Sequence, residues 1–386
     1  MPETHARLSA SGAHRWMACT PSVALEERFP DKGSEYAAEG TLAHSMAELI
    51  IRYNNGEITK KTFSTRMNKI RKDELYSKEM EDYIVEYTQT VWEIFNEVKA
   101  ECPDAQLLPE QRLDFSEYVP GGFGTGDVVI IADDMVQVID LKYGKGVGVS
   151  AVGNPQLRLY GIGAYLEHSM LYDIQRVKET IIQPRLENVS TEELTVEELM
   201  EWADTEVRPK AELAIAGEGE FVPGDHCRFC KAKAVCRARA DENLALMKLD
   251  FRDPDILEEW EIGEVLKRAE ELNDWAKDVK DYAFDQALNH GVKFEGWKLV
   301  EGRSNRKYLD EDKVKEALIE AGYSQDKITE TKILGITAME KEIGKKSFGE
   351  ILSELVVKPE GKPVLVPETD KRPEICTADS AKKDFE

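Results

Sequence analysis

The sequence predicts an α/β protein with a mainly helical C-terminal extension. Two observations support this fold class: apolar residues recur at helical spacing on both sides of a strand-rich region at 108–142, and the chain beyond about residue 240 again has a helical pattern. The 386 residues are 41% hydrophobic and 33% charged, which is the composition of a soluble globular protein with a full-sized core.

Helices are expected on the N-terminal side of the strand region. In residues 37–53 (AAEGTLAHSMAELIIRY), Leu42, Met46 and Tyr53 fall on one stripe at helical spacing. A second helix is expected over 77–100.

Two strand-forming runs, VVIIA and MVQVID, are separated by Asp133 and Asp134, which predict a two-residue hairpin turn. Pairing counted back from this turn sets Asp127 directly opposite Asp140, and opposed side chains share a face with Cβ atoms about 4.5–5.5 Å apart. Lys142 lies two residues beyond Asp140 on the same strand and projects to the same face. Two acids and one lysine are therefore expected to converge.

Helices and a strand are expected to alternate after the hairpin. Helices are predicted over 155–168 and, from a Thr cap, over 195–216, with a strand centred on 180–183. Beyond residue 240 we expect helices at 255–290, 311–321 and 337–355, a strand at 293–302 and an extended or disordered tail. The predicted organisation is a domain at 1–240, a mainly helical extension at 241–356 and the tail at 357–386.

The net charge of −24 and pI of about 4.8 argue against a protein that coats nucleic acid through a basic surface. Local charge differs from this total. Residues 141–166 contain no acid and carry Lys142, Lys145 and Arg158, and a second small basic cluster comprises Arg303, Arg306 and Lys307. An acidic enzyme with a basic slot remains compatible with this pattern.

The chain has no run of eighteen apolar residues and no apolar signal region at its start, so neither a membrane span nor export is expected. A cytoplasmic location follows as the expectation. Without an export signal, closely spaced cysteines indicate metal ligation more often than disulfides.

Asp127, Asp140 and Lys142 together suggest metal-dependent phosphodiester hydrolysis. Carboxylate oxygens suit Mg²⁺ or Mn²⁺, and a nearby lysine can orient the nucleophile or stabilise developing charge. The alternative is that Asp127 ends a turn while Asp140 and Lys142 form a cross-strand salt bridge without catalysis. The hairpin register favours the metal site over this alternative.

These motifs resemble the PD-(D/E)XK nuclease superfamily and, within it, the RecB-like exonucleases. The resemblance rests on Gly124, Thr125 and Asp127, on Asp140 and Lys142, and on Gln156 and Tyr160, which lie four apart on one helical face. It implies a restriction-endonuclease-like core, with a central mixed sheet flanked by helices. It also implies that Gln156 and Tyr160 contact the DNA backbone or position the metal site.

RecB-like members carry an early helical histidine as a further metal ligand, and GTLAHSMAEL supplies His44. On a helical wheel His44 lies almost opposite the stripe of Leu42, Met46 and Tyr53, which favours a ligand over a core histidine. Glu110 is either an additional acid on the preceding strand or an ordinary exposed residue.

The cysteines extend the resemblance to AddB-type and CRISPR-adaptation exonucleases. In those proteins, one early and three late cysteines hold a [4Fe–4S] cluster; here these are Cys19, Cys227, Cys230 and Cys236. Such an iron–sulfur subdomain would close a loop of about two hundred residues. Structural Zn²⁺ on the same thiolates is the alternative, with His226 able to replace one. Cys102 and Cys376 are expected to be free thiols.

The resemblance covers about 8–240 and is closest to a phage-borne branch catalogued as a domain of unknown function. It implies a Mg²⁺-dependent (or Mn²⁺-dependent) DNA exonuclease that processes linear duplex ends in phage recombination or replication, in the cytoplasm of a bacterial host. By analogy, a single-strand annealing or binding protein would be its partner. The alternative is a catalytically inactive DNA-end-binding or assembly module that retains the nuclease fold.

Overall fold

The computed structural model describes residues 6–30, 35–246, 259–298 and 311–320, together with positions 336, 339, 344, 348 and 351. The chain divides into two compact units, Met1–Ala283 and Phe284–Glu386. The first unit contains the sheet and all of the candidate site residues.

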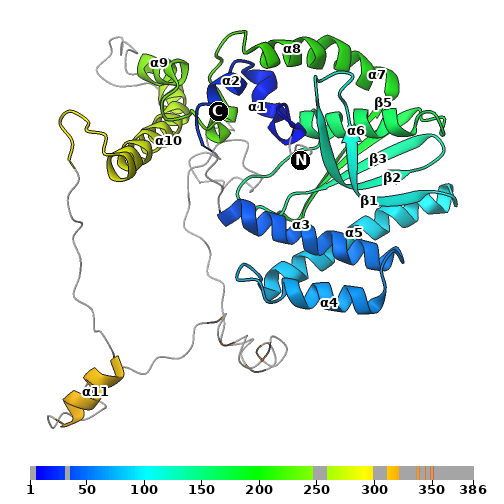
Figure 1. Ribbon diagram of the computed structural model, residues 1–386, viewed down its shortest axis with the longest axis horizontal. Helices are drawn as coiled ribbons and strands as arrows, with labels where there is room; N and C mark the ends of the chain where they lie inside the picture. Colours follow the sequence, from blue (N-terminus) through cyan, green and yellow to red (C-terminus); the bar gives the residue numbers. More distant parts are fainter. Residues whose placement is uncertain are drawn as a thin grey trace, which may run out of the picture. The chain divides into compact units, whose positions relative to one another are not determined.

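A five-stranded mixed sheet forms the centre of the first unit (Figure 1). Its strands, in spatial order, are β1 (Gln106–Asp114), β2 (Phe123–Ile131), β3 (Met135–Leu141), β4 (Arg176–Gln183) and β5 (Asn188–Thr195). β1, β2 and β3 pair antiparallel, β4 runs parallel to β3, and β5 is antiparallel to β4. The prediction of an α/β fold with a mixed sheet flanked by helices is confirmed.

Two helices cover one face of the sheet, α3 (Glu35–Asn54) and α5 (Lys78–Glu101), and α4 (Lys60–Ile70) packs against α3 (Figure 1). α3 and α5 match the helices expected at 37–53 and 77–100. α4 was not expected, because only Phe63, Met67 and Ile70 give it an apolar side and the rest of the helix is polar or basic.

The opposite face packs against α6 (Pro155–His168) and against helices from both ends of the first unit. These are η1 (Ala10–Gly12), α1 (Ala13–Ala18), α2 (Ser22–Glu26), α7 (Val196–Trp202), a π-helical turn η3 (Ala203–Val207) and α8 (Arg208–Ala216). α6 begins where it was predicted, because the Asn154 side chain accepts hydrogen bonds from the N–H groups of Gln156 and Leu157 and Pro155 opens the first turn. Thr195 caps α7 in a capping box with Glu198.

The remaining described elements are η2 (Pro184–Leu186), η4 (Asp225–Phe229), α9 (Arg237–Leu246), α10 (Glu259–His290) and α11 (Glu311–Glu320). The first unit extends beyond residue 240, where the sequence suggested the end of the nuclease domain. Arg239 and Lys233 explain this, because both form ion pairs with Asp278 of α10, at 2.6 and 2.9 Å.

Two strand predictions differ from the structure. β5 was missed because NVSTEELT offers almost no apolar residues to alternate with polar ones. The strand predicted at 293–302 is absent over 293–298, where Gly296 adopts a left-handed φ of 79° that interrupts an extended chain. The rest of that strand, the helix expected at 337–355 apart from isolated positions, and the tail at 357–386 lie outside the described residues.

Within the described part of the chain, no helix combines the length and the apolar character needed to cross a membrane.

Candidate functional site

The β2–β3 hairpin has the predicted register. Its described pairs run from Ile131↔Val136 to Val128↔Ile139, so the next pair of positions is Asp127 and Asp140. Val129 and Val138 pack into the core on the α6 side of the sheet, and side chains alternate along a strand. Asp140 therefore projects to the α6-facing side, where Gln156 contacts it, whereas Asp127, opposite the left-handed Glu110, reaches His44 of α3.

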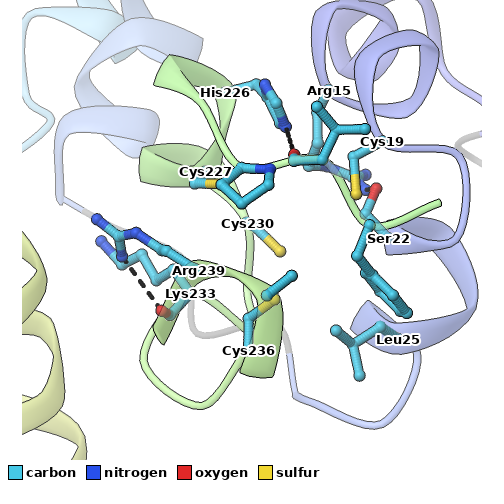
Figure 2. A pocket seen from close by; sticks show the side chains of 14 residues that line it. Arg15, Cys19, Ser22, Leu25, His226, Cys227, Cys230, Lys233, Cys236 and Arg239 are labelled. Carbon is cyan, nitrogen blue, oxygen red and sulfur yellow. Dashed lines mark hydrogen bonds between the residues drawn. The ribbon is translucent and has the colours of Figure 1, made fainter. Parts of the chain in front are cut away.

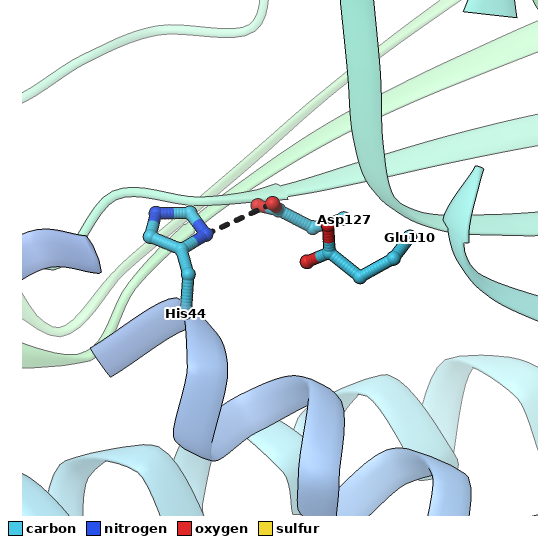
Figure 3. Close-up of side chains that lie close together, drawn as sticks. All are labelled: His44, Glu110 and Asp127. Atoms are coloured by element: carbon cyan, nitrogen blue, oxygen red, sulfur yellow. Dashed lines mark hydrogen bonds and ion pairs between the residues drawn. The ribbon is translucent and has the colours of Figure 1, made fainter. Parts of the chain in front are cut away.

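Asp127 joins the sheet to α3. Its Oδ2 accepts a hydrogen bond from the Leu141 N–H at 2.6 Å, and its Oδ1 lies 2.9 Å from Nδ1 of His44 (Figure 3). The first contact fixes the carboxylate against β3, while the second fixes the imidazole. The predicted helical histidine and hairpin aspartate are thus in direct contact.

Glu110 of β1 is the third member of this group. Pro109 pairs with Val128 and Gln111 with Gly126, so Glu110 stands opposite Asp127 across the β1–β2 ladder. Ligand atoms of His44, Glu110 and Asp127 all lie within 4.8 Å of one another (Figure 3). Of the two interpretations offered for Glu110, the structure favours the additional acid.

The backbone of Glu110 is left-handed, with φ 51°, which is uncommon for a residue other than glycine and costs on the order of 1–3 kcal/mol. Such strain concentrates at functional sites, because neighbouring structure must maintain it. The strained residue here is the one whose carboxylate joins His44 and Asp127.

Asp140 is buried and is surrounded by the other predicted residues. Its Oδ1 accepts a hydrogen bond from Nε2 of Gln156 at 3.2 Å, and its Oδ2 lies 2.9 Å from the Lys142 ammonium. The ammonium also donates to Oε1 of Gln156 at 2.7 Å, and Gln156 donates to the Tyr160 hydroxyl at 3.4 Å. Gln156 therefore connects α6 to both members of the Asp–Lys pair.

Gly124 is required by the position of Tyr160. A Cβ at residue 124 would lie 2.5 Å from Cε1 of the Tyr160 ring, far inside van der Waals contact. The glycine of the sequence motif thus allows the ring to lie directly against β2.

We call the assembled residues His44, Glu110, Asp127, Asp140 and Lys142 the carboxylate site.

The electrostatics of the carboxylate site show an excess of negative charge. Burial lowers the pKa of His44, but the carboxylates of Asp127, Asp140 and Glu110 together outweigh burial and the pKa rises to about 9. Burial, reinforced by Asp127, raises the pKa of Glu110 to about 7. Burial also raises the pKa of Asp140, against the opposing effect of Lys142. Closely spaced acids of this kind are stabilised by an added cation.

A divalent cation fits this donor set. An imidazole nitrogen and carboxylate oxygens are suitable ligands for Mn²⁺, and the carboxylates for Mg²⁺. Oδ2 of Asp140 is buried and lies 2.9 Å from the Lys142 ammonium, and a carboxylate oxygen has a second lone pair with which it can bind a cation. Burial, reinforced by Asp127 and Asp140, raises the pKa of the Tyr87 phenol, whose buried hydroxyl has no hydrogen-bond partner among the residues that the structure describes.

The four predicted cysteine ligands line one cavity of about 20 Å³ (Figure 2). Cys19 ends α1, while Cys227, Cys230 and Cys236 follow α8. Two contacts hold these distant segments together: the Thr20 hydroxyl donates to the Glu218 carbonyl at 2.6 Å, and the Lys231 N–H donates to the Glu26 carboxylate at 2.7 Å. We call this region the cysteine cavity.

The sulfur atoms of the cysteine cavity are not tightly clustered. Among described residues, no three cysteines have Sγ atoms within 4.8 Å of one another. Four thiolates on one Zn²⁺, with bonds of about 2.3 Å, would lie about 3.8 Å apart. Burial raises the pKa of the Cys230 thiol to about 12 and also raises that of Cys227, so both are protonated without a bound metal.

Other residues named from the sequence have different surroundings. Nε2 of His226 lies 2.9 Å from the Val222 carbonyl oxygen. Arg158 is not a free cation, since it forms two contacts of 2.7 and 3.0 Å with the Glu192 carboxylate. Cys102 is a half-buried free cysteine at the end of α5. Cys376 and the cluster of Arg303, Arg306 and Lys307 lie outside the described residues.

The chain is similar to a solved structure titled "Crystal structure of SSO0001", with 15% sequence identity and a TM-score of 0.24. The similarity covers 50% of this chain and 85% of that one. A family model described as "Protein of unknown function (DUF2800)" matches residues 5–373. Because this match spans nearly the whole sequence, the chain belongs to the DUF2800 family.

Proposed function

We propose that this protein is a divalent-metal-dependent deoxyribonuclease of the PD-(D/E)XK type, acting as an exonuclease on linear duplex ends. The observation that carries the proposal is the convergence of Glu110, Asp127 and His44 beside the Asp140–Lys142 pair. The alternative, an Asp140–Lys142 salt bridge without catalysis, does not account for the contact between His44 and Asp127 or for the strained backbone of Glu110.

Each residue has a chemical role in this proposal. His44, Glu110, Asp127 and Asp140 would hold Mg²⁺ or Mn²⁺, which activates water and offsets charge on the phosphate when bound. Lys142, fixed by Gln156 and Asp140, would orient the attacking water and stabilise developing negative charge. Gln156 holds Lys142 through one amide atom and Asp140 through the other, so it positions both.

Tyr160 would keep Gln156 in place. Its hydroxyl accepts from the Gln156 amide, and its ring is confined by β2 at Gly124. Both side chains would also lie beside the substrate strand, as the resemblance implies. This arrangement puts the catalytic lysine on a rigid support of sheet and helix.

The cysteine cavity would hold a [4Fe–4S] cluster with a structural role. Four cysteines around one cavity support this, and sulfurs spread more widely than a single zinc ion requires favour the cluster over Zn²⁺. Broad visible absorbance and iron in the purified protein would support the cluster. A colourless protein with stoichiometric zinc would instead indicate Zn²⁺ on the same thiolates.

The proposed setting is phage recombination or replication in a bacterial cytoplasm, beside a single-strand annealing or binding protein. These elements come from the resemblance. Co-purification with such a protein after co-expression would test the association directly.

The deciding experiment incubates linear duplex DNA, labelled at its 5′ or 3′ end, with the protein and Mg²⁺ or Mn²⁺. Progressive loss of nucleotides that stops in Asp140→Asn would support the exonuclease, and the labels would give its polarity. Asp133→Asn, at the exposed hairpin turn, is the matched control. DNA-end binding without cleavage, in a protein that binds metal, would favour the inactive end-binding module instead.

A further inference from the structure

We propose that α4 is a binding surface for the phosphate backbone of duplex DNA. This inference rests on the proposed nuclease function and identifies where substrate beyond the carboxylate site would lie. It is carried by a concentration of unpaired positive charge on a rigid helix of an acidic protein.

The segment 60–72 contains no acid and six cations, in a chain with a net charge of −24. Arg71 is bound to the Glu81 carboxylate at 2.7 Å. The other five are exposed and form no ion pair with any residue that the structure describes: Lys60, Lys61, Arg66, Lys69 and Lys72. Paired surface charges are common elsewhere in the first unit, so this unpaired set is a distinct local feature.

The helix presents its cations outward because its apolar side is fixed in the core. Phe63, Met67 and Ile70 pack into the α3–α5 core, and the Phe63 ring stacks on Tyr53 of α3 at 4.5 Å between centroids. At 100° per residue, Lys61 lies nearly opposite this apolar side and Lys69 lies beside it, and Lys72 follows two residues after the end of α4. The lysines therefore face solvent on a surface that does not need to rearrange.

The chemistry of the face suits a phosphodiester backbone better than a lipid surface. Helices that bind membranes insert an exposed apolar side, whereas the apolar side of α4 is already occupied by the core. Asn68 lies beside Lys61 and Lys69 and offers amide donors for phosphate oxygens, while the Thr65 hydroxyl donates to the Lys61 carbonyl at 2.9 Å. Charge with interleaved neutral donors is the pattern of contacts that position DNA without reading its sequence.

The structure relates α4 to the carboxylate site through α3. α4 packs against α3 and runs back along it after the turn at 55–59 (Figure 1). Tyr53 is nine residues from His44 on α3, which is about 13 Å along the helix axis. At an axial rise of about 3.4 Å per base pair, this length corresponds to about four base pairs. Because Tyr53 and His44 lie on nearly opposite sides of α3, a duplex bound at both places would extend around α3.

The test measures binding of a fluorescent linear duplex by anisotropy in EDTA, so that cleavage does not contribute, over a range of salt concentrations. Lys61→Gln/Lys69→Gln/Lys72→Gln should weaken binding roughly 10- to 100-fold and lower the slope of log affinity against log salt by about 2–3. The matched control is Lys277→Gln/Lys280→Gln/Lys293→Gln, which removes the same charge from exposed sites elsewhere and should leave both quantities near the wild-type values.

Affinity and salt slope unchanged in the α4 variant, or reduced equally in the control, would overturn the inference. If the triple lysine variant loses binding to anionic phospholipid vesicles but still binds DNA, the inference is also overturned, and the surface binds membranes instead. Nuclease activity is measured separately. Cleavage with no role for α4 would refute only this inference, and α4-dependent binding without cleavage would refute only the nuclease.

Discussion

The carboxylate site and the cysteine cavity differ in how completely the protein organises them. In the carboxylate site, hydrogen bonds and ion pairs of 2.6–3.4 Å connect side chains from α3, α6 and the sheet. In the cysteine cavity, two segments that are distant in the sequence meet, but no three cysteine Sγ atoms of the described residues lie within 4.8 Å of one another. A metal at the first would therefore supply charge and chemistry, whereas a bound group at the second would also complete the structure.

The largest expected effect is on catalysis. Lys142→Met should reduce cleavage by roughly 10²–10³-fold while Mn²⁺ still binds, because only the ammonium is removed. Asp140→Asn should reduce cleavage at least as much and also weaken Mn²⁺ binding, because it removes a proposed ligand. Cleavage rates and calorimetric titration with Mn²⁺ measure the two effects. Retention of wild-type cleavage by both variants would exclude the assigned site.

The next largest effect concerns the cysteine cavity. Cys230→Ser should abolish visible absorbance and lower the free energy of unfolding by roughly 2–5 kcal/mol, as expected for loss of a link that closes a long loop. Denaturant unfolding followed by circular dichroism measures the change, and proteolysis should begin within residues 6–30. Cys102→Ser, a half-buried cysteine outside the cavity, is the control. Equal stability of both variants would mean that no bound group links the two segments.

A smaller effect tests whether the carboxylate site depends on the packing behind it. Gly124→Ala would place a methyl group 2.5 Å from the Tyr160 ring and displace the ring from Gln156. We expect about 1–3 kcal/mol of destabilisation and a roughly 10- to 100-fold loss of cleavage. Gly144→Ala, at a glycine with open space around it, is the matched control. If Gly124→Ala cleaves normally, the support from Tyr160 is not needed.

Much of the carboxylate site could be predicted because one short turn fixes it. A two-residue turn leaves a single register, so Asp127 and Asp140 could be placed opposite each other by counting. Glu110 could not be placed in the same way. The connection between β1 and β2 spans eight residues, 115–122, and a loop of that length does not determine which residues face each other.

The basic slot expected at 141–166 shows a second limit of the sequence. Its Arg158 is neutralised by Glu192, which lies on β5, a strand that apolar periodicity could not reveal. The more distinctive basic surface belongs to α4, a helix with only three apolar positions. For Arg158 the missing information was its partner, and for α4 it was that the cations have no partner among the described residues; both depend on long-range packing.

The smallest expected effect sharpens the comparison by asking what a buried carboxylate costs without partners. Glu179 is fully buried on β4, and neither of its carboxylate oxygens has a hydrogen-bond partner in the part of the chain that the structure describes. Burial raises the pKa of this carboxyl well above the usual range. Because the pKa of the Glu179 carboxyl is raised in the folded state, the folded protein favours the protonated form over the charged form. The unfavourable contribution of Glu179 to stability therefore appears as pH rises above the ordinary glutamate pKa of about 4.5, and it grows towards neutral pH.

Glu179→Gln should raise the free energy of unfolding at neutral pH by about 1–3 kcal/mol and flatten the pH dependence of that free energy. Glu192→Gln, which breaks the pair with Arg158, should instead destabilise, and thermal unfolding from pH 5 to 8 would distinguish them. If Glu192→Gln stabilises the protein, or if Glu179→Gln destabilises it, the contacts seen in the folded core do not determine how these two carboxylates contribute to stability.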